Sequence, residues 1–257
     1  MRDVFRLRSL LAVAVVVALA TALSGCTTQK PANSGSSPSS DSSSSTATNT
    51  ADSAPVKGAV SAEEATPAPS APSEATAQEF ADGNFGTFAP VSGSGKGPGF
   101  VKVPVGATGA IVSATHKGKS NFAIEGVGAD NKPTGLLVNT AGNYRGVTMF
   151  TSDVKPVKLK VTADGTWTLK ISPVSSASKA TSSNSGTGDA VLLYDGAAAS
   201  WNLTHAGSAD FSVRFLSMEA DSVVVNKTGK FSGTVSAPAG PAVVIVGANG
   251  KWTMVAR

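Results

Sequence analysis

Short runs of alternating or continuous hydrophobic residues fill the C-terminal two thirds of this 257-residue chain. Segments 100–103 and 157–161 alternate apolar and polar residues, which is the period of a half-buried strand. Segments 191–194 and 243–246 are short apolar runs, which are typical of buried strands. No window of this region combines a helical stripe with helix caps, so the pattern predicts strands alone.

Three blocks of this region occur twice in the same order, which identifies an internal duplication. Their offsets are 89, 87 and 85 residues, the small drift expected when surface loops shorten between copies. The paired blocks are Thr115–Ile124 with Thr204–Val213, Leu137–Gly146 with Val224–Gly233, and Ala163–Leu169 with Ala248–Met254.

The duplicated strands predict an all-β fold of two tandem antiparallel β-sandwich, or barrel-like, repeats. We place the repeats at residues 89–174 and 189–257, joined by a flexible Ser/Gly-rich linker over 175–188. The alternative is that the two halves share one core, because a copy of this size buries little surface alone. Asp164-Gly165 and Asn249-Gly250 lie between apolar runs and predict a type I′ hairpin at the end of each copy.

Residues 26–88 contain mainly Ser, Thr, Ala, Pro and Gly. Such a segment buries too little surface to offset its ordering entropy, so we expect a disordered tether. Phe80, Phe85 and Phe88 are its only aromatic residues, and the fold is expected to begin near Phe80 and to pack one of them.

The N-terminus has the pattern of an export signal: Arg2, Arg6 and Arg8 precede a largely apolar run from Leu10 to Leu23. This run has 14 residues, too few for a helix that spans a bilayer. Leu23-Ser24-Gly25-Cys26 closes it with the only cysteine of the chain.

These four residues resemble the lipobox of bacterial lipoproteins. The resemblance implies that residues 1–25 are a signal peptide removed before Cys26, and that Cys26 receives acyl chains. The protein would then be exported and held by lipid on the outer face of the cell membrane, on the periplasmic or extracellular side. The alternative is an ordinary signal peptide with an incidental cysteine.

Charge is distributed unevenly between the tether and the repeats. Residues 27–88 carry 2 basic and 7 acidic side chains, whereas residues 89–257 carry 16 basic and 9 acidic ones. A basic head suits an anionic cell envelope, although it equally suits an ordinary soluble surface. A nucleic-acid partner is not expected, because the chain has an export signal and no Arg-rich run or aromatic stacking motif.

The candidate binding residues are those that recur in both copies: His116 and His205, Trp167 and Trp252, and Tyr144, which matches Phe231. An exposed Trp beside a loop stacks on a sugar ring or anchors a protein partner. The competing interpretation is structural: Thr-His-x-Gly is local turn chemistry, and an aromatic residue on a strand fills the core. Trp201 stands where the first copy has Val112 and is expected to face inward.

No cofactor or metal site is predicted, because one His per copy without nearby Asp, Glu or Cys is a poor zinc site. A Gly-x-Ser-x-Gly elbow and an EF-hand loop are also absent from the sequence. The repeats loosely resemble small β-sandwich accessory modules of secreted bacterial proteins, which implies binding of an envelope glycan or surface protein, or a structural role. The alternatives are a hydrolase of envelope polymers that uses His116 or His205 with an acidic residue, and the solute-binding component of a transporter.

Overall fold

The computed structural model describes residues 75–151 and 155–257. The proposed signal peptide, Cys26 and the tether up to residue 74 lie outside these residues. Within the described part of the chain, no helix is both long enough and apolar enough to cross a membrane.

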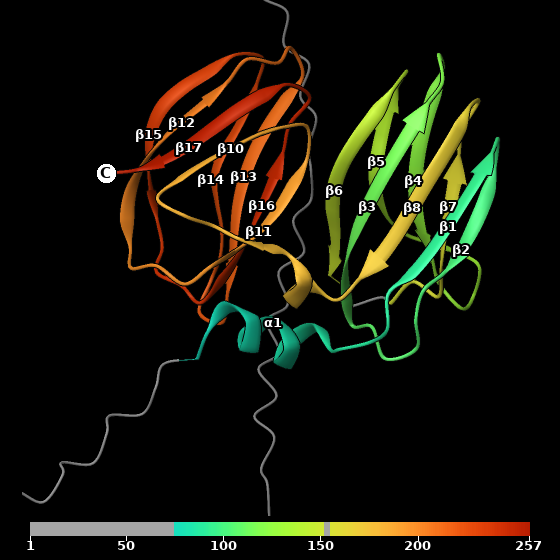
Figure 1. The fold of residues 1–257 in the computed structure, drawn as a ribbon, viewed down its shortest axis with the longest axis horizontal. Helices are drawn as coiled ribbons and strands as arrows, with labels where there is room; N and C mark the ends of the chain where they lie inside the picture. Colours follow the sequence, from blue (N-terminus) through green and yellow to red (C-terminus); the bar gives the residue numbers. More distant parts are fainter. Residues whose placement is uncertain (1–74, 152–154) are drawn as a thin grey trace, which may run out of the picture. The chain divides into compact units, whose positions relative to one another are not determined.

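The first repeat consists of eight strands in two four-stranded sheets (Figure 1). One sheet has the order β1-β8-β3-β6 and the other β2-β7-β4-β5, and all of their strand pairs are antiparallel. The strands are β1 Val91–Lys96, β2 Gly99–Lys102, β3 Gly109–Lys117, β4 Asn121–Val127, β5 Pro133–Ala141, β6 Tyr144–Thr151, β7 Lys158–Thr162 and β8 Thr166–Ser172.

The second repeat has the same plan, in the orange to red part of Figure 1. Its sheets have the orders β10-β17-β12-β15 and β14-β13-β16-β11-β9, in which the short β9 is an additional parallel strand. The strands are β9 Ser178–Lys179, β10 Ser183–Thr187, β11 Ala190–Tyr194, β12 Ala199–His205, β13 Asp210–Ser217, β14 Asp221–Thr228, β15 Phe231–Ala237, β16 Ala242–Gly247 and β17 Lys251–Ala256.

The fold is therefore all-β, as the sequence pattern predicts. The strand orders 1-8-3-6 and 2-7-4-5 are those of a jelly roll, a sandwich of two four-stranded sheets. Strands β10 to β17 repeat this order position by position, so the duplication seen in the sequence is a duplication of one jelly roll.

The expected terminal hairpins are not formed. β7 pairs with β2 and β4, whereas β8 pairs with β1 and β3, so Asp164-Gly165 carries the chain from one sheet to the other. Gly165 lacks the positive φ of a type I′ turn. A Cβ at Gly165 would lie 1.8 Å from the carbonyl oxygen of Lys117, so a close backbone approach requires this glycine.

Residues 175–188, expected to be a linker, contain structure. They hold part of the 3₁₀ turn η1 (Val174–Ser176), strand β9 and strand β10. The strands of the second repeat thus begin with β9 at Ser178, before the expected boundary at 189.

Helix α1 (Ala77–Phe85) lies within the segment expected to be a tether. Thr76 and Glu79 form a reciprocal capping box that starts the helix. Phe80 and Phe85 are buried, and the Ala77 N–H donates to Asp195 Oδ1 in the second repeat. Among the described residues, the first element is this helix, which contains the expected Phe80.

Three hydrophobic clusters hold the described residues together. Each sandwich encloses one of them, around Phe122 in the first repeat and Phe211 in the second. The third joins α1 to both repeats through Phe80, Ile111 and Leu193. The copies therefore have separate cores and share an additional one.

Candidate functional site

The outer face of the β1-β8-β3-β6 sheet carries a ladder of hydroxyl side chains. Strand alternation sends every second residue outward, and register aligns these residues across the sheet. One row contains Ser94, Thr168, Thr115 and Arg145, and the next contains Ser92, Lys170, Ser113 and Val147.

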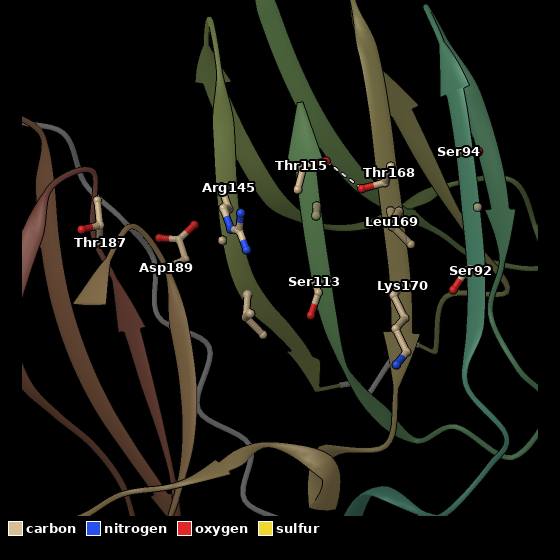
Figure 2. Close-up of a pocket in the computed structure, with 14 residues that line it drawn as sticks. Ser92, Ser94, Ser113, Thr115, Arg145, Thr168, Leu169, Lys170, Thr187 and Asp189 are labelled. Carbon is tan, nitrogen blue, oxygen red and sulfur yellow. Dashed lines mark hydrogen bonds between the residues drawn. The ribbon is translucent and has the colours of Figure 1, made fainter. Parts of the chain in front are cut away.

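These rows line a hollow of about 780 Å³, shown in Figure 2. Its lining is formed mostly by β1, β8, β3 and β6, while Thr187 and Asp189 come from the start of the second repeat. The volume is in the range of small-molecule sites. Hydroxyl groups that both donate and accept suit a ligand with many hydroxyl groups of its own.

Two cations distinguish this hollow from a neutral polar surface. Arg145 and Lys170 are exposed at its lining, and in the structure of residues 75–151 and 155–257 neither forms an ion pair. A guanidinium without a carboxylate partner is available for bidentate binding of an anionic oxygen pair.

The second repeat keeps the hydroxyl ladder and lacks the cations. Its corresponding row is Ser185, Thr253, Thr204 and Ser232, so a serine stands in place of Arg145. Val255 stands in place of Lys170 in the next row. The duplication thus provides an internal comparison: these two rows carry Arg145 and Lys170 in the first copy and no cation in the second.

A threonine pair is common to both copies. Thr115 Oγ1 lies 2.6 Å from Thr168 Oγ1, and Thr204 Oγ1 lies 2.6 Å from Thr253 Oγ1. Cross-strand Thr pairs of this kind stabilise a sheet. The ladder therefore supports the sheet, and the cations beside it supply the charge that a ligand would meet.

Tyr144 and Asp189 connect the first repeat to the start of the second. The Tyr144 hydroxyl donates to Asp189 Oδ2 at 2.7 Å, and Asp189 Oδ1 accepts from the Ala248 N–H at 2.9 Å. Burial and the adjacent Asp189 charge raise the pKa of Tyr144 well above its ordinary value. Tyr144 also lines a second hollow, of about 920 Å³, so this sequence candidate lies between the copies.

His116 and His205 are core residues, with exposed fractions of 1% and 3%. Each Nδ1–H donates to a glycine carbonyl, of Gly142 at 2.7 Å and of Gly229 at 2.8 Å. Each ring also stacks on a phenylalanine, Phe122 or Phe211, at 4.5 and 4.6 Å between ring centres. The structural interpretation of the Thr-His-x-Gly motif accounts for all of these contacts.

The structure does bring an acidic residue to His116, as the hydrolase alternative requires. Asp164 Oδ1 lies 3.3 Å from Nε2, an ion-pair separation without hydrogen-bond geometry. Gly118 covers this edge of the ring so closely that a Cβ there would lie 2.5 Å from Nε2. A buried and covered Nε2 offers no approach for a substrate, and His205 has Asn249 in the corresponding place.

The tryptophans are also buried. The Trp167 Nε1–H donates to the Gly97 carbonyl and the Trp252 Nε1–H to the Gly188 carbonyl, both at 2.8 Å. Trp201 is inward, as expected. Four of the five candidate binding residues, His116, His205, Trp167 and Trp252, thus belong to the fold, because at most 5% of each is exposed to a ligand.

Sequence reasoning missed Arg145 and Lys170. Recurrence was the criterion for choosing candidates, and these two residues differ between the copies. The signal in the sequence was divergence between the copies: Arg145 aligns with Ser232, and Lys170 aligns with Val255. Among the described residues, no group of three His, Cys, Asp or Glu side chains could hold a metal ion.

No family model matches this sequence, and no curated protein matches it. Similar solved structures include cAMP-bound PfPKA-R, residues 141–441, with 13% identity and a TM-score of 0.19 over 66% of this chain and 71% of that one. Another is the regulatory subunit of a cAMP-independent protein kinase A from Trypanosoma cruzi bound to guanosine, with 7% identity and a TM-score of 0.18 over 65% and 72%.

A third is the stem and receptor binding domain of spike protein P1 from bacteriophage PM2, with 10% identity and a TM-score of 0.11 over 66% and 79% of the two chains. Scores this low carry no argument about function.

Proposed function

We propose that this protein is an exported, lipid-anchored protein whose first jelly roll binds an anionic, polyhydroxylated polymer of the cell envelope without acting on it. The observation that carries the binding proposal is the hollow on the β1-β8-β3-β6 sheet, where Arg145 and Lys170 flank a hydroxyl ladder.

The chemistry of the hollow fits a glycan that carries carboxylate or phosphate groups. Ser and Thr hydroxyls exchange hydrogen bonds with sugar hydroxyls, and the two cations provide charge-assisted hydrogen bonds, which are about twice as strong as neutral ones. Asp189, the carboxylate at the rim, already accepts hydrogen bonds from Tyr144 and Ala248, so its charge is partly satisfied.

The anchor proposal rests on Leu23-Ser24-Gly25-Cys26 and the apolar run before it. In a bacterial host supplied with labelled fatty acid, the full chain should incorporate the label and Cys26→Ser should not, because the implied acyl chains attach at Cys26. Ser24→Ala, which keeps a small residue in the four-residue motif, serves as the control and should still incorporate the label. A labelled Cys26→Ser protein, or an unlabelled native chain, would contradict the anchor.

The binding proposal is tested by exchanging residues between the copies. Arg145→Ser with Lys170→Val gives the first repeat the residues of the second. Affinity for polygalacturonate, measured by calorimetry, should fall by at least about tenfold to a hundredfold, the loss expected if even one hydrogen bond to a charged group, at about 1.5–3 kcal/mol, is removed. The reciprocal pair Ser232→Arg with Val255→Lys should create a second site.

A neutral dextran of similar length is the matched ligand control. The proposal predicts weak or undetectable dextran binding that neither exchange changes. Equal polygalacturonate affinity in the native chain and the Arg145→Ser, Lys170→Val variant would refute the assignment of the site. Cleavage of the polymer during these measurements would favour the hydrolase alternative instead.

A further inference from the structure

The second sheet of the first repeat is β2-β7-β4-β5 (Figure 1). Its outer face combines lysines with exposed large apolar side chains. One register row across it contains Phe100, Lys160, Glu125 and Leu136, and the next begins with Lys102 and Lys158. We call Phe100, Leu136, Lys102, Lys158 and Lys160 the lysine face.

The second repeat places different residues at the corresponding positions. Val191 replaces Phe100, Leu193 replaces Lys102, and Val243 and Ile245 replace Lys158 and Lys160. These four aliphatic residues belong to the third hydrophobic cluster, together with α1. The same face of the jelly roll is therefore covered in the second copy and left open, with lysines, in the first.

Two large apolar side chains on the lysine face are exposed to solvent. Phe100 is 62% exposed and Leu136 59% exposed. Lys158 Nζ lies 5.2 Å from the centre of the Phe100 ring, so cation and aromatic ring are presented together. A protective role against association with other chains would explain the lysines of this face. It would not explain why Phe100 and Leu136 are exposed among them.

Charge on this face is predominantly positive. Lys160 pairs with Glu125 at 3.6 Å, and Lys132 in the adjoining loop pairs with Asp130 at 3.5 Å. In the described residues, Lys102 and Lys158 have no carboxylate partner within ion-pair distance. Lys158 Nζ donates to Asn131 Oδ1 at 2.8 Å, which is a neutral partner, so among the described residues no carboxylate neutralises either cation.

We propose that the lysine face docks on the surface of an anionic lipid bilayer. Lysines provide attraction to anionic headgroups, and Phe100 and Leu136 provide the apolar groups that enter the interface between headgroups and acyl chains. The proposal rests on the proposed lipid anchor at Cys26 for its cellular setting, because an anchored chain is already at a membrane. Its physical test does not need the anchor.

The test uses a chain that starts at residue 27, which keeps all three hydrophobic clusters and has no site for lipid. Its binding to vesicles of equal parts phosphatidylglycerol and phosphatidylcholine is measured by co-sedimentation at low and high salt. Binding should be strong at low salt and weaker at high salt, since salt screens exposed charges. Pure phosphatidylcholine vesicles should bind much less.

Changing Lys102, Lys158 and Lys160 together to Gln should lower the partition coefficient about a hundredfold, at about fivefold per lysine. The matched control changes three exposed lysines of the second repeat, Lys227, Lys230 and Lys251, to Gln and removes the same charge. It should retain most of the binding. Phe100→Ser should reduce binding at both salt concentrations, and thermal unfolding checks that each variant is folded.

Absence of binding to the phosphatidylglycerol vesicles would overturn the proposal. An equal loss in the two triple variants would also overturn it, because net charge and not this face would then determine binding. If the chain binds a synthetic peptide of residues 27–74 through the lysine face and does not bind vesicles, the occupant of this face is the acidic tether and not a bilayer. Polygalacturonate binding in the same chain is independent of these results, so failure here is distinguishable from failure of the proposed function.

Discussion

At the residue scale, the duplication separates what the fold needs from what one copy adds. His116 and His205 make the same contacts, with a glycine carbonyl and a stacked phenylalanine, in both copies. Arg145 and Lys170 have no basic counterpart in the second copy. In a duplicated domain of this kind, residues that recur are explained by packing, and residues that diverge are the better candidates for binding.

Asp164 is a divergent residue with a structural effect. The pKa of its carboxyl lies below its ordinary value, mainly because the Lys119 N–H donates to it, with a further hydrogen bond from the Ser120 N–H. A lowered pKa means that the ionised form stabilises the folded state. This contribution is present above the ordinary value of 3.8 and is lost as pH falls through the folded-state pKa.

We therefore expect Asp164→Asn to be less stable than the native chain at neutral pH, with the difference shrinking as pH falls below about 3.8. The measurement is the midpoint of urea unfolding of the two proteins across this pH range. The reciprocal change Asn249→Asp is the matched variant and should add an acid-sensitive contribution in the second repeat. A difference that does not vary with pH would mean that the charge of Asp164 has no role.

At the scale of elements, the strands follow from the sequence and their pairing does not. Alternation at 157–161 predicts β7, and the apolar runs at 191–194 and 243–246 predict β11 and β16. Asp164-Gly165 was expected to join paired neighbours, because short turns usually do. In this jelly roll, most successive strands, β7 and β8 among them, lie in opposite sheets, whereas β4 and β5 pair within one sheet, and which of the two occurs depends on the whole topology.

Helix α1 also depends on tertiary contacts that the sequence pattern does not reveal. Its capping box, Thr76 with Glu79, is a local signal that can be found in the sequence. It was hidden in a Ser/Thr/Pro/Ala-rich segment whose composition favours disorder. The helix is stabilised by burial of Phe80 and Phe85 in the third cluster, a tertiary contact that composition does not reveal.

The candidate site was predictable only in part. The Ser and Thr residues of β1, β3 and β8 were visible in the sequence but resembled tether and loop composition. Their common face follows from strand register, which joins Ser94, Thr168 and Thr115 from segments more than 20 residues apart. Without that register, Arg145 and Lys170 had no visible neighbours that would mark them as a site.

At the scale of the whole molecule, the third hydrophobic cluster makes the two jelly rolls interdependent. It contains Phe80 and Phe85 from α1, Ile111 from β3, and Val191 and Leu193 from β11. The Val147 N–H also donates to the Asp189 carbonyl at 2.9 Å, which joins β6 to the start of the second repeat. Loss of the cluster should therefore affect both copies and not only the helix.

Phe80→Ala tests this interdependence. Truncating a buried Phe costs about 3–5 kcal/mol, and here the loss should speed hydrogen exchange in β3 and in β11 together, measured segment by segment with mass spectrometry. Phe100→Ala removes the same atoms from an exposed ring and should change the free energy of unfolding by less than about 0.5 kcal/mol. If Phe80→Ala speeds exchange in α1 alone, the helix is an appendage and the two repeats are stable without it. If both repeats respond, α1 is the element that couples them, and a change of length in the segment before Thr76 should leave that coupling intact.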